Sequence, residues 1–404
     1  MKKFSKCVIC SGKLKKNIIN LGKLPICEDF VEIGKNKKNK FYKTSLNFCP
    51  RCITVFQDKI INQRKIFPKS YKYRPRFTND VINGMKNLGE EFLKKYNYNK
   101  NDYVCDIGCS DGSLLNFFKK KMKTIGVEPT FAGKEARKNG HRIIIDYFDN
   151  KAALKIKKIT EGKLKLITFT NVFAHIVNFK QLIKNLKILI NDQTVIIIEN
   201  HYLGEIIKKN QFDSFYSEHP RTYSFKSFQY IAKLLDCEIS EVQFPSRYGG
   251  NIRVFLNKKI NKINKYNVKH KEDYILKSIY KVQKKIENWK KVSSKTLIYF
   301  KQKNLRLYGK ALPARAIVLI NMLKMDSKIM PFVFEKVGSK KIGHYVPGTK
   351  IKIVGDDQWI NKKIKPEAMV IWGWHIYKEI KKYLNNNGYN KKLYIPLPKF
   401  KKIV

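Results

Sequence analysis

Residues 104–112, with the sequence VCDIGCSDG, place an apolar strand directly before a turn built from small residues. Glycines in such a turn let the backbone approach a ligand closely, and the amphipathic segment 114–118 is expected to open a helix. The spacing Asp106-x-Gly108-x-x-x-Gly112 is the variant of the dinucleotide turn that binds S-adenosylmethionine (SAM). For this stretch alone the alternative is an ordinary strand-to-helix turn. The stretch predicts an open α/β sheet with a cofactor at one edge.

Further strands follow with a polar residue at each carboxyl end. Residues 124–127 form a second strand ending at Glu128, an acid placed to bind the ribose hydroxyls. Residues 143–145 are a third, ending at Asp146, where an acid often meets the adenine amine in SAM domains. Strands 164–170 and 195–198 precede Asn171 and Glu199. Ligands of open α/β sheets bind at this edge, so the predicted cofactor residues are Asp106, Gly108, Gly112, Glu128, Asp146 and Asn171.

Two pairs of cysteines lie near the start of the chain, Cys7-x-x-Cys10 and Cys49-x-x-Cys52. Two such knuckles place four thiolates around a tetrahedral zinc ion. Because four thiolates leave no open coordination position, the predicted Zn²⁺ is structural. A redox pair is the alternative for either knuckle alone, and Cys27 is a possible substitute ligand.

The length of 404 residues suggests two to three domains. We expect an α/β protein with a small zinc-binding module at residues 1–70, a Rossmann-like SAM methyltransferase domain at 71–257, and a C-terminal Rossmann-like domain at 258–404. In the last segment a long amphipathic helix is predicted within 258–306. A helix at 314–325 and strands at 306–309, 331–335, 350–354 and 369–372 repeat the α/β alternation, without a second SAM-type glycine set.

Lysine and arginine number 84 against 32 acids, a net charge of +52 that is typical of proteins binding nucleic acid or anionic surfaces. The lysines are spread along the whole chain, however, which favours a solvated surface over one binding site. No apolar run approaches the length of a membrane span, and the first residues lack a secretory signal. We therefore expect a cytoplasmic protein that does not contact a membrane.

Taken together, these pieces resemble the SAM-dependent sugar C-methyltransferases that act on nucleotide-linked 4-keto deoxysugars. The resemblance covers nearly the whole chain. Besides the cysteine module and the SAM unit, it rests on the elements Leu21-Gly22-x-x-Pro25, Cys49-x-x-Cys52-x-x-x-x-Gln57, Asn171-Val172-Phe173-Ala174-His175, Tyr216-x-Glu218-His219, Val346-Pro347-Gly348-Thr349 and Trp372-Gly373-Trp374-His375. Two departures stand out: Ser217 where the family commonly has His, and Tyr248-Gly249-Gly250-Asn251 where it has His-Gly-Gly-Ser.

The resemblance implies C-methylation, at C-3, of a nucleotide-diphosphate keto sugar through a base-generated enolate, in surface-polysaccharide or secondary-metabolite synthesis. His219 is our candidate base, since histidine ionises near neutral pH. Tyr216 is a donor to the enolate oxygen, although the sequence leaves open which of the two is the base. Glu218 orients or tunes a partner. The predicted substrate-binding residues are Asn251, Arg253 and Tyr73.

Other readings remain for these residues. His219 as a loop histidine, Tyr216 as a core aromatic and Arg253 as a surface charge are the structural alternatives. A zinc-ribbon RNA methyltransferase is the alternative function, and a non-catalytic binding protein is another. Against the RNA enzyme, the chain has no Asn-Pro-Pro-Tyr element and no Pro-Cys nucleophile. We expect a monomer without a nucleic-acid partner.

Overall fold

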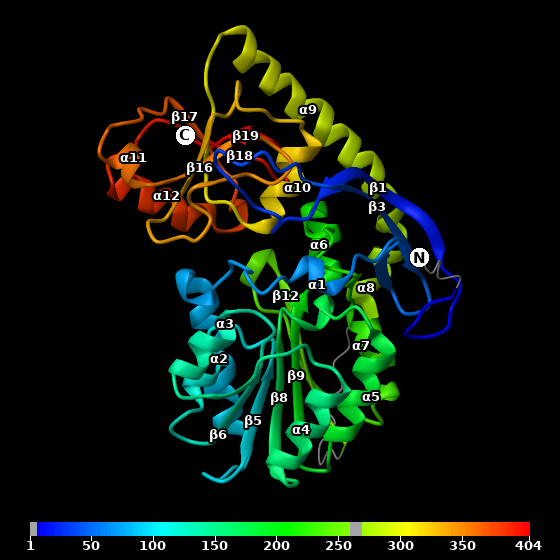
Figure 1. The fold of residues 1–404 in the computed structure, drawn as a ribbon. Helices are drawn as coiled ribbons and strands as arrows, with labels where there is room; N and C mark the ends of the chain where they lie inside the picture. Colours follow the sequence, from blue (N-terminus) through cyan, green and yellow to red (C-terminus); the bar gives the residue numbers. More distant parts are fainter. Residues whose placement is uncertain (1–5, 259–268) are drawn as a thin grey trace.

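A computed structural model describes residues 6–258 and 269–404 of the chain. Figure 1 shows a large central sheet, a second sheet above it in orange and red, and the blue N-terminal strands along one side. This part of the chain contains three sheets, and the two larger ones have the parallel centre and helical cover of the expected α/β architecture. Within the described residues, no helix is both long and apolar enough to cross a bilayer.

The central sheet has seven strands in the order β11-β12-β9-β8-β5-β6-β7. Five of them run parallel, and β12 lies antiparallel between β9 and β11. The strand order reverses between β5 and β8, so their carboxyl ends border a crevice. The bounds are β5 (Tyr103–Ile107), β6 (Lys123–Val127), β7 (Arg142–Ile144), β8 (Leu164–Thr170), β9 (Val195–His201), β11 (Glu238–Gln243) and β12 (Asn251–Asn257).

Amphipathic helices cover both faces of this sheet (Figure 1). Asp149 caps α4 by accepting from the Ala152 backbone N–H, and Ser224 and Ser227 form a capping box on α7. The helices are α2 (Asn79–Lys95), α3 (Ala132–Lys138), α4 (Asn150–Thr160), α5 (Phe179–Leu189), α6 (Leu203–Lys208) and α7 (Phe225–Leu234), with short turns η1 (Pro75–Phe77), η3 (Phe173–His175), η4 (Phe212–Ser214) and η5 (Arg247–Gly249).

The helix expected after the glycine turn is not formed. Only a 3₁₀ turn, η2 (Leu115–Phe117), follows Gly112. Leu114, Leu115 and Phe118 are all buried in the cluster that contains α2, and the chain enters β6 a few residues later. The apolar residues of this segment are therefore buried in a short turn and do not form the apolar stripe of an amphipathic helix.

The C-terminal sheet has eight strands in the order β19-β18-β17-β13-β14-β16-β15-β2, with a parallel centre from β18 to β16. Its strands are β13 (Tyr308–Lys310), β14 (Phe332–Glu335), β15 (His344–Tyr345), β16 (Lys352–Gly355), β17 (Ala368–Ile371), β18 (Lys392–Ile395) and β19 (Lys401–Lys402). Its helices are α10 (Ala314–Met322), α11 (Asp357–Ile360) and α12 (Tyr377–Asn386), with the turn η7 (Trp374–Ile376).

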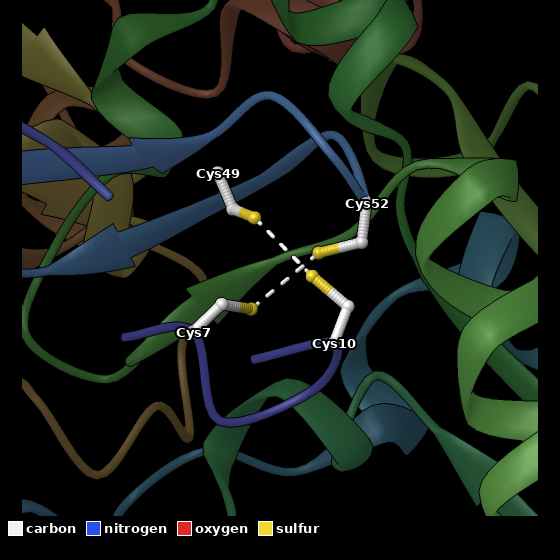
Figure 2. A group of neighbouring side chains, drawn as sticks. All are labelled: Cys7, Cys10, Cys49 and Cys52. Atoms are coloured by element: carbon white, nitrogen blue, oxygen red, sulfur yellow. Dashed lines mark hydrogen bonds between the residues drawn. The ribbon is translucent and has the colours of Figure 1, made fainter. Parts of the chain in front are cut away.

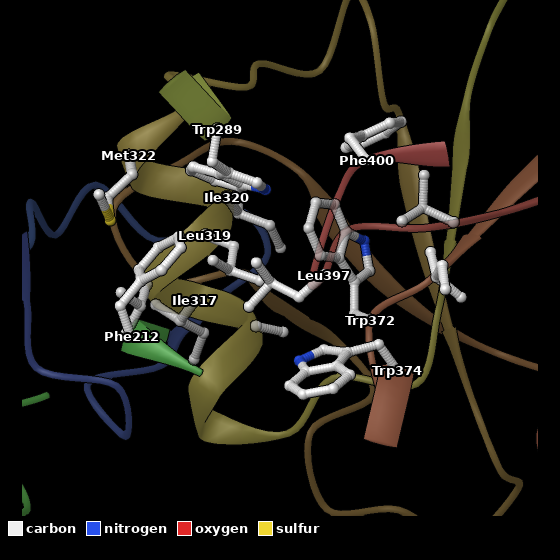
Figure 3. Packing of buried hydrophobic residues seen from close by; sticks show 14 of the residues in the cluster. Phe212, Trp289, Ile317, Leu319, Ile320, Met322, Trp372, Trp374, Leu397 and Phe400 are labelled. Carbon is white, nitrogen blue, oxygen red and sulfur yellow. The ribbon is translucent and has the colours of Figure 1, made fainter. Parts of the chain in front are cut away.

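The helix predicted within 258–306 is interrupted. It consists of α8 (Lys269–Ser278), the 3₁₀ turn η6 (Ile279–Lys281) and α9 (Val282–Gln302), while residues 259–268 of that prediction lie outside the described part. Trp289 of α9 packs on Phe212, with ring centroids 4.9 Å apart, and its Nε1 donates to the Pro396 carbonyl oxygen. Figure 3 shows both rings beside the helix α10, which carries Ile317, Leu319 and Ile320. Because Phe212 belongs to the methyltransferase segment, the two large units share a hydrophobic core.

The N-terminal strands β1 (Lys15–Pro25), β3 (Phe41–Cys49) and β4 (Thr54–Gln57) form an antiparallel sheet, which α1 (Gln63–Ile66) follows. Two short strands belong to one predicted domain but pair with a sheet of another. β10 (Arg221–Thr222) completes this sheet by pairing with β4, and β2 (Val31–Glu32) pairs with β15 of the C-terminal sheet. Pairing between strands of different units cannot be predicted from local hydrophobic periodicity. The domain boundaries at residues 70 and 257 remain proposed boundaries.

Candidate active site

A cavity of about 390 Å³ lies where the three units meet. The methyltransferase sheet contributes the turns after β5, β6, β8 and β9, and the C-terminal unit contributes the turns after β13, β14 and β17. Glu28, Gln63 and Phe67 enter from the N-terminal unit, and the stretch 71–77 that follows adds aromatic and basic side chains. The cavity therefore has a wall from each unit.

The glycine turn forms the cofactor end of this cavity. Gly108 has φ +74°, and a Cβ there would come within 2.6 Å of the Val172 side chain, so only glycine fits. Asp106 lies beneath the turn, fully enclosed, and accepts from Thr168 Oγ1 at 2.7 Å. Burial raises the pKa of Asp106 to about 7, although the Thr168 hydrogen bond opposes the shift. Asp106 supports the turn and does not line the cavity.

Glu128 lines the cavity at the end of β6. One of its carboxylate oxygens accepts from the Ser110 backbone N–H at 3.0 Å and the other from the Thr130 N–H at 2.9 Å. The carboxylate is thereby fixed beside the glycine turn with lone pairs to spare for two hydroxyls. Asn171 also lines the cavity, with φ +56°. This end suits a SAM molecule for two reasons. The glycine at position 108 lets a ligand approach the backbone closely, and the oriented carboxylate of Glu128 lines the same space.

Besides Asp106, two more predicted cofactor residues do not line the cavity. Strand β7 ends at Ile144, so Asp146 is exposed and its Oδ1 accepts from the Tyr147 backbone N–H at 2.8 Å. Tyr147 and Phe148 reach the cavity in its place. Gly112, with φ +79°, packs against the His141 ring and permits the turn without facing the cavity.

His219 lines the cavity and follows the turn η4 in the chain. Its Nδ1 is 2.8 Å from the Ser214 carbonyl oxygen, an atom that only accepts, so the ring carries its proton on Nδ1. Nε2 then has a free lone pair. Burial lowers the pKa of His219 to about 4, and the charge of Arg315 acts in the same direction. A neutral imidazole with one free nitrogen is the state that a general base needs.

Tyr216 and Glu218 line the same cavity. The Tyr216 ring is 4.4 Å from that of His219, and burial raises the pKa of Tyr216 well above its ordinary value. Glu218 is 1% exposed; its Oε2 accepts from Tyr71 Oη at 3.2 Å, and its Oε1 has no partner among the described residues. Burial and the nearby Glu28 raise the pKa of Glu218 well above that of a free acid. Tyr216 therefore keeps its proton at neutral pH, and burial favours the neutral form of Glu218.

Of the three predicted substrate-binding residues, one lines the cavity and two do not. Tyr73 lines the cavity, with its hydroxyl 2.8 Å from that of Tyr248. Asn251 and Arg253 do not reach the cavity. Asn251 Nδ2 donates to Glu199 Oε1 at 2.8 Å, and Arg253 Nε donates to Glu199 Oε2 at 2.8 Å. Their position on β12, beside β9, turns both toward this buried acid.

Several lining residues were missed as site residues. His175 stacks on His219 with centroids 5.0 Å apart, and His201 meets it edge to face at 5.1 Å. Tyr248 has φ +53°, uncommon for a tyrosine, and its carbonyl oxygen accepts from Arg315. Two sequence features point to these residues. His201 follows the predicted strand 195–198, and Tyr248 replaces the histidine that the family commonly has.

The C-terminal unit contributes most of the cavity's cations. Lys310 Nζ donates to both oxygens of Asp356, at 2.7 and 2.6 Å, and Arg315 is paired with Asp213. Lys336 and Lys341 line the same end and make no ion pair among the described residues. This end of the cavity suits an anionic group.

The four predicted metal ligands converge away from the cavity. Figure 2 shows Cys7, Cys10, Cys49 and Cys52 pointing toward one another, and all their sulfurs lie within 4.8 Å. The Cys7–Cys52 and Cys10–Cys49 sulfur distances are 3.5 and 3.4 Å. A tetrahedral ion with zinc–sulfur bonds of about 2.3 Å separates its ligands by about 3.8 Å. The cluster therefore fits a structural zinc ion, and Cys27 lies outside it.

Family models match three parts of the chain. Residues 7–67 match a zinc binding domain, residues 77–242 a methyltransferase domain, and residues 246–398 the C-methyltransferase C-terminal domain. The chain belongs to the family of C-methyltransferases with an N-terminal zinc-binding module. The resemblance found in the sequence is confirmed, and so are SAM and zinc as the cofactors of this C-methyltransferase family member.

One curated relative is C-methyltransferase NovU of Streptomyces niveus, 22% identical over 253 residues. The alignment spans 62% of this chain and 60% of NovU. Among solved structures, a SAM-dependent methyltransferase from Archaeoglobus fulgidus is 12% identical, covers 44% of this chain and 94% of its own length, and gives a TM-score of 0.36. Magnesium protoporphyrin IX methyltransferase from Synechocystis, solved with SAH, is 12% identical, with 45% and 84% coverage and a TM-score of 0.35.

Proposed function

We propose that this protein transfers a methyl group from SAM to C-3 of a nucleotide-linked 4-keto deoxysugar, in the cytoplasm and as a monomer. The observation that supports this most is the shared cavity: the cofactor turn at Gly108 and the free nitrogen of His219 face one space. Such an arrangement brings a methyl donor and a carbon acid together, as a C-methylation requires.

In a 4-keto sugar the C-3 proton is acidic because its loss gives an enolate. In our proposal His219 Nε2 takes that proton. Tyr216, which keeps its own proton, donates a hydrogen bond to the enolate oxygen, and this favours His219 over Tyr216 as the base. SAM supplies, when bound, an electrophilic methyl group. Gly108 and Glu128 would hold the cofactor at its end of the cavity.

Glu218 has a positioning role in this proposal. Its carboxyl group is fixed through Tyr71, and its unpartnered Oε1 is available to a sugar hydroxyl. The diphosphate is placed at the cationic end formed by Lys336 and Lys341 rather than at Arg253, because Arg253 is occupied by Glu199. Tyr73 and its partner Tyr248 remain available to the nucleotide or the sugar.

The proposal is tested by incubating the protein with a panel of nucleotide-linked 4-keto sugars in heavy water, followed by mass spectrometry. We expect a gain of one methyl group with SAM, and deuterium uptake at C-3 without SAM. Protein that binds SAM but produces neither change on any sugar would contradict the proposal and favour an RNA substrate. Deuterium uptake without methylation would support the enolate step and place the error in the choice of sugar.

A further inference from the structure

His201 is the last residue of β9, and its ring lines the cavity. The ring meets His219 edge to face, with centroids 5.1 Å apart and planes at 74°. On another side the Tyr248 ring lies 5.5 Å away at 35°. A substrate atom within reach of the His219 ring is therefore also close to His201.

The two ring nitrogens of His201 have different surroundings. Nδ1 is enclosed and has no hydrogen-bond partner in the part of the chain that the structure describes. Nδ1 lacks a partner in either tautomer, so it costs about 1–3 kcal/mol as an unpaired donor or as an unpaired acceptor. Only the tautomer with its proton on Nε2 gains a hydrogen bond when a substrate oxygen occupies the cavity. Since Nδ1 is the enclosed nitrogen, Nε2 is the one through which the ring faces the cavity.

A substrate oxygen in the cavity would thus select opposite tautomers for His201 and His219. The carbonyl oxygen of Ser214 fixes the His219 proton on Nδ1 and leaves an acceptor in the cavity, whereas His201 presents a donor. Tyr216, His175, Arg315 and His375 also face this space, and Arg315 is a cation there. Burial, with the nearby His219 and Arg315, lowers the pKa of His201 well below its ordinary value. The His201 donor is therefore neutral, and a neutral imidazole is able to polarise a carbonyl group.

We propose that His201 Nε2–H is a second donor to the enolate oxygen, beside Tyr216; this rests on the function proposed above. As the C-3 proton moves to His219 Nε2, the C–H electron pair forms the C-3–C-4 double bond. The carbonyl π pair moves to the oxygen, and His201 hydrogen-bonds the resulting oxyanion while keeping its own proton. His201 is then a catalytic residue that contacts the reacting atoms.

The test compares His201→Phe and His201→Asn with the wild type on a sugar that the wild type methylates. We measure C-3 deuterium exchange without SAM, turnover with SAM, and the Kd of SAM. Removing one oxyanion donor costs about 10²–10³ in rate in well-studied enzymes, so we expect His201→Phe to lose about that factor in exchange and in kcat. The Kd of SAM is expected to stay within about twofold. Asn, which keeps an N–H, is expected to recover part of the rate.

His344→Phe is the matched control, because His344 lies in β15 and does not line the cavity. Exchange by His201→Phe at the wild-type rate would overturn the inference and leave the proposed function standing. Absence of exchange and methylation in the wild type itself would overturn both. If His201→Phe does not fold, His201→Ala, which also removes the N–H, takes its place in the comparison.

Discussion

Arg315 donates through Nε and Nη2 to the two carboxylate oxygens of Asp213, at 3.1 and 2.8 Å, across the junction of the two large units. Asp213 also accepts from Trp374 Nε1 at 2.8 Å. The guanidinium further holds the Tyr248 carbonyl oxygen at 2.8 Å, so one buried ion pair fixes a cavity wall as well as the junction.

Asp213→Asn is therefore expected to lower the free energy of unfolding by about 3–5 kcal/mol, because it leaves the Arg315 charge buried without its partner. Urea unfolding followed by fluorescence measures the change. Glu367→Gln is the control: the Glu367–Lys391 pair is exposed, and its loss is expected to cost at most about 1 kcal/mol. Equal effects of the two substitutions would show that the Asp213 pair does not stabilise the junction.

Glu128→Gln is expected to weaken SAM binding by roughly tenfold to a hundredfold, since a fixed carboxylate acceptor becomes an amide. Isothermal titration calorimetry of the purified protein measures the Kd. Asp146→Asn is the informative partner, because that carboxylate is exposed and outside the cavity. We expect less than about a twofold change there. A larger loss of SAM affinity in Asp146→Asn would support the adenine-binding role that the sequence predicted for Asp146.

Cys49→Ser is expected to abolish stable zinc binding, because three thiolates and a hydroxyl hold the ion much less well than four thiolates. Metal content by mass spectrometry and the thermal midpoint of unfolding are the measurements. Cys237→Ser, a buried cysteine outside the cluster, is expected to keep its zinc. A Cys49→Ser protein with full zinc content and an unchanged midpoint would exclude Cys49 as a ligand.

The stability of the protein is expected to fall in mild acid. The pKa of His219 is lowered from 6.5 to about 4, so the unfolded chain binds this proton first as the pH drops. The contribution of neutral His219 is complete above about pH 6.5 and is lost as the pH falls toward 4. The raised pKa of Glu218 acts in the opposite direction. The difference between wild type and His219→Gln, from urea midpoints at several pH values, isolates the histidine, and parallel curves would contradict this assignment.

The sequence predicted the parallel core of the methyltransferase sheet because each strand is an apolar run that ends in a polar residue. Strand β8 has the predicted bounds, and Gly108, Glu128 and His219 all line the cavity. Local pattern did not reveal side-chain direction. Asn251 and Arg253 turn inward to Glu199, and Asp146 turns to solvent, although all three are polar residues near a strand end. His201 was not predicted as a site residue, because only the folded structure shows that it lies beside His219.

The pairing of β2 with β15 has a consequence for how the chain is made. Val31 leaves the ribosome about 300 residues before its partner Tyr345 is made. The N-terminal segment that carries Glu28 to the cavity therefore cannot take its final position until β15 has been synthesised. A nascent chain released before β15 would have a complete methyltransferase sheet and an unfinished cavity. Completion of the active site is thus coupled to the synthesis of β15 rather than to the folding of the catalytic unit.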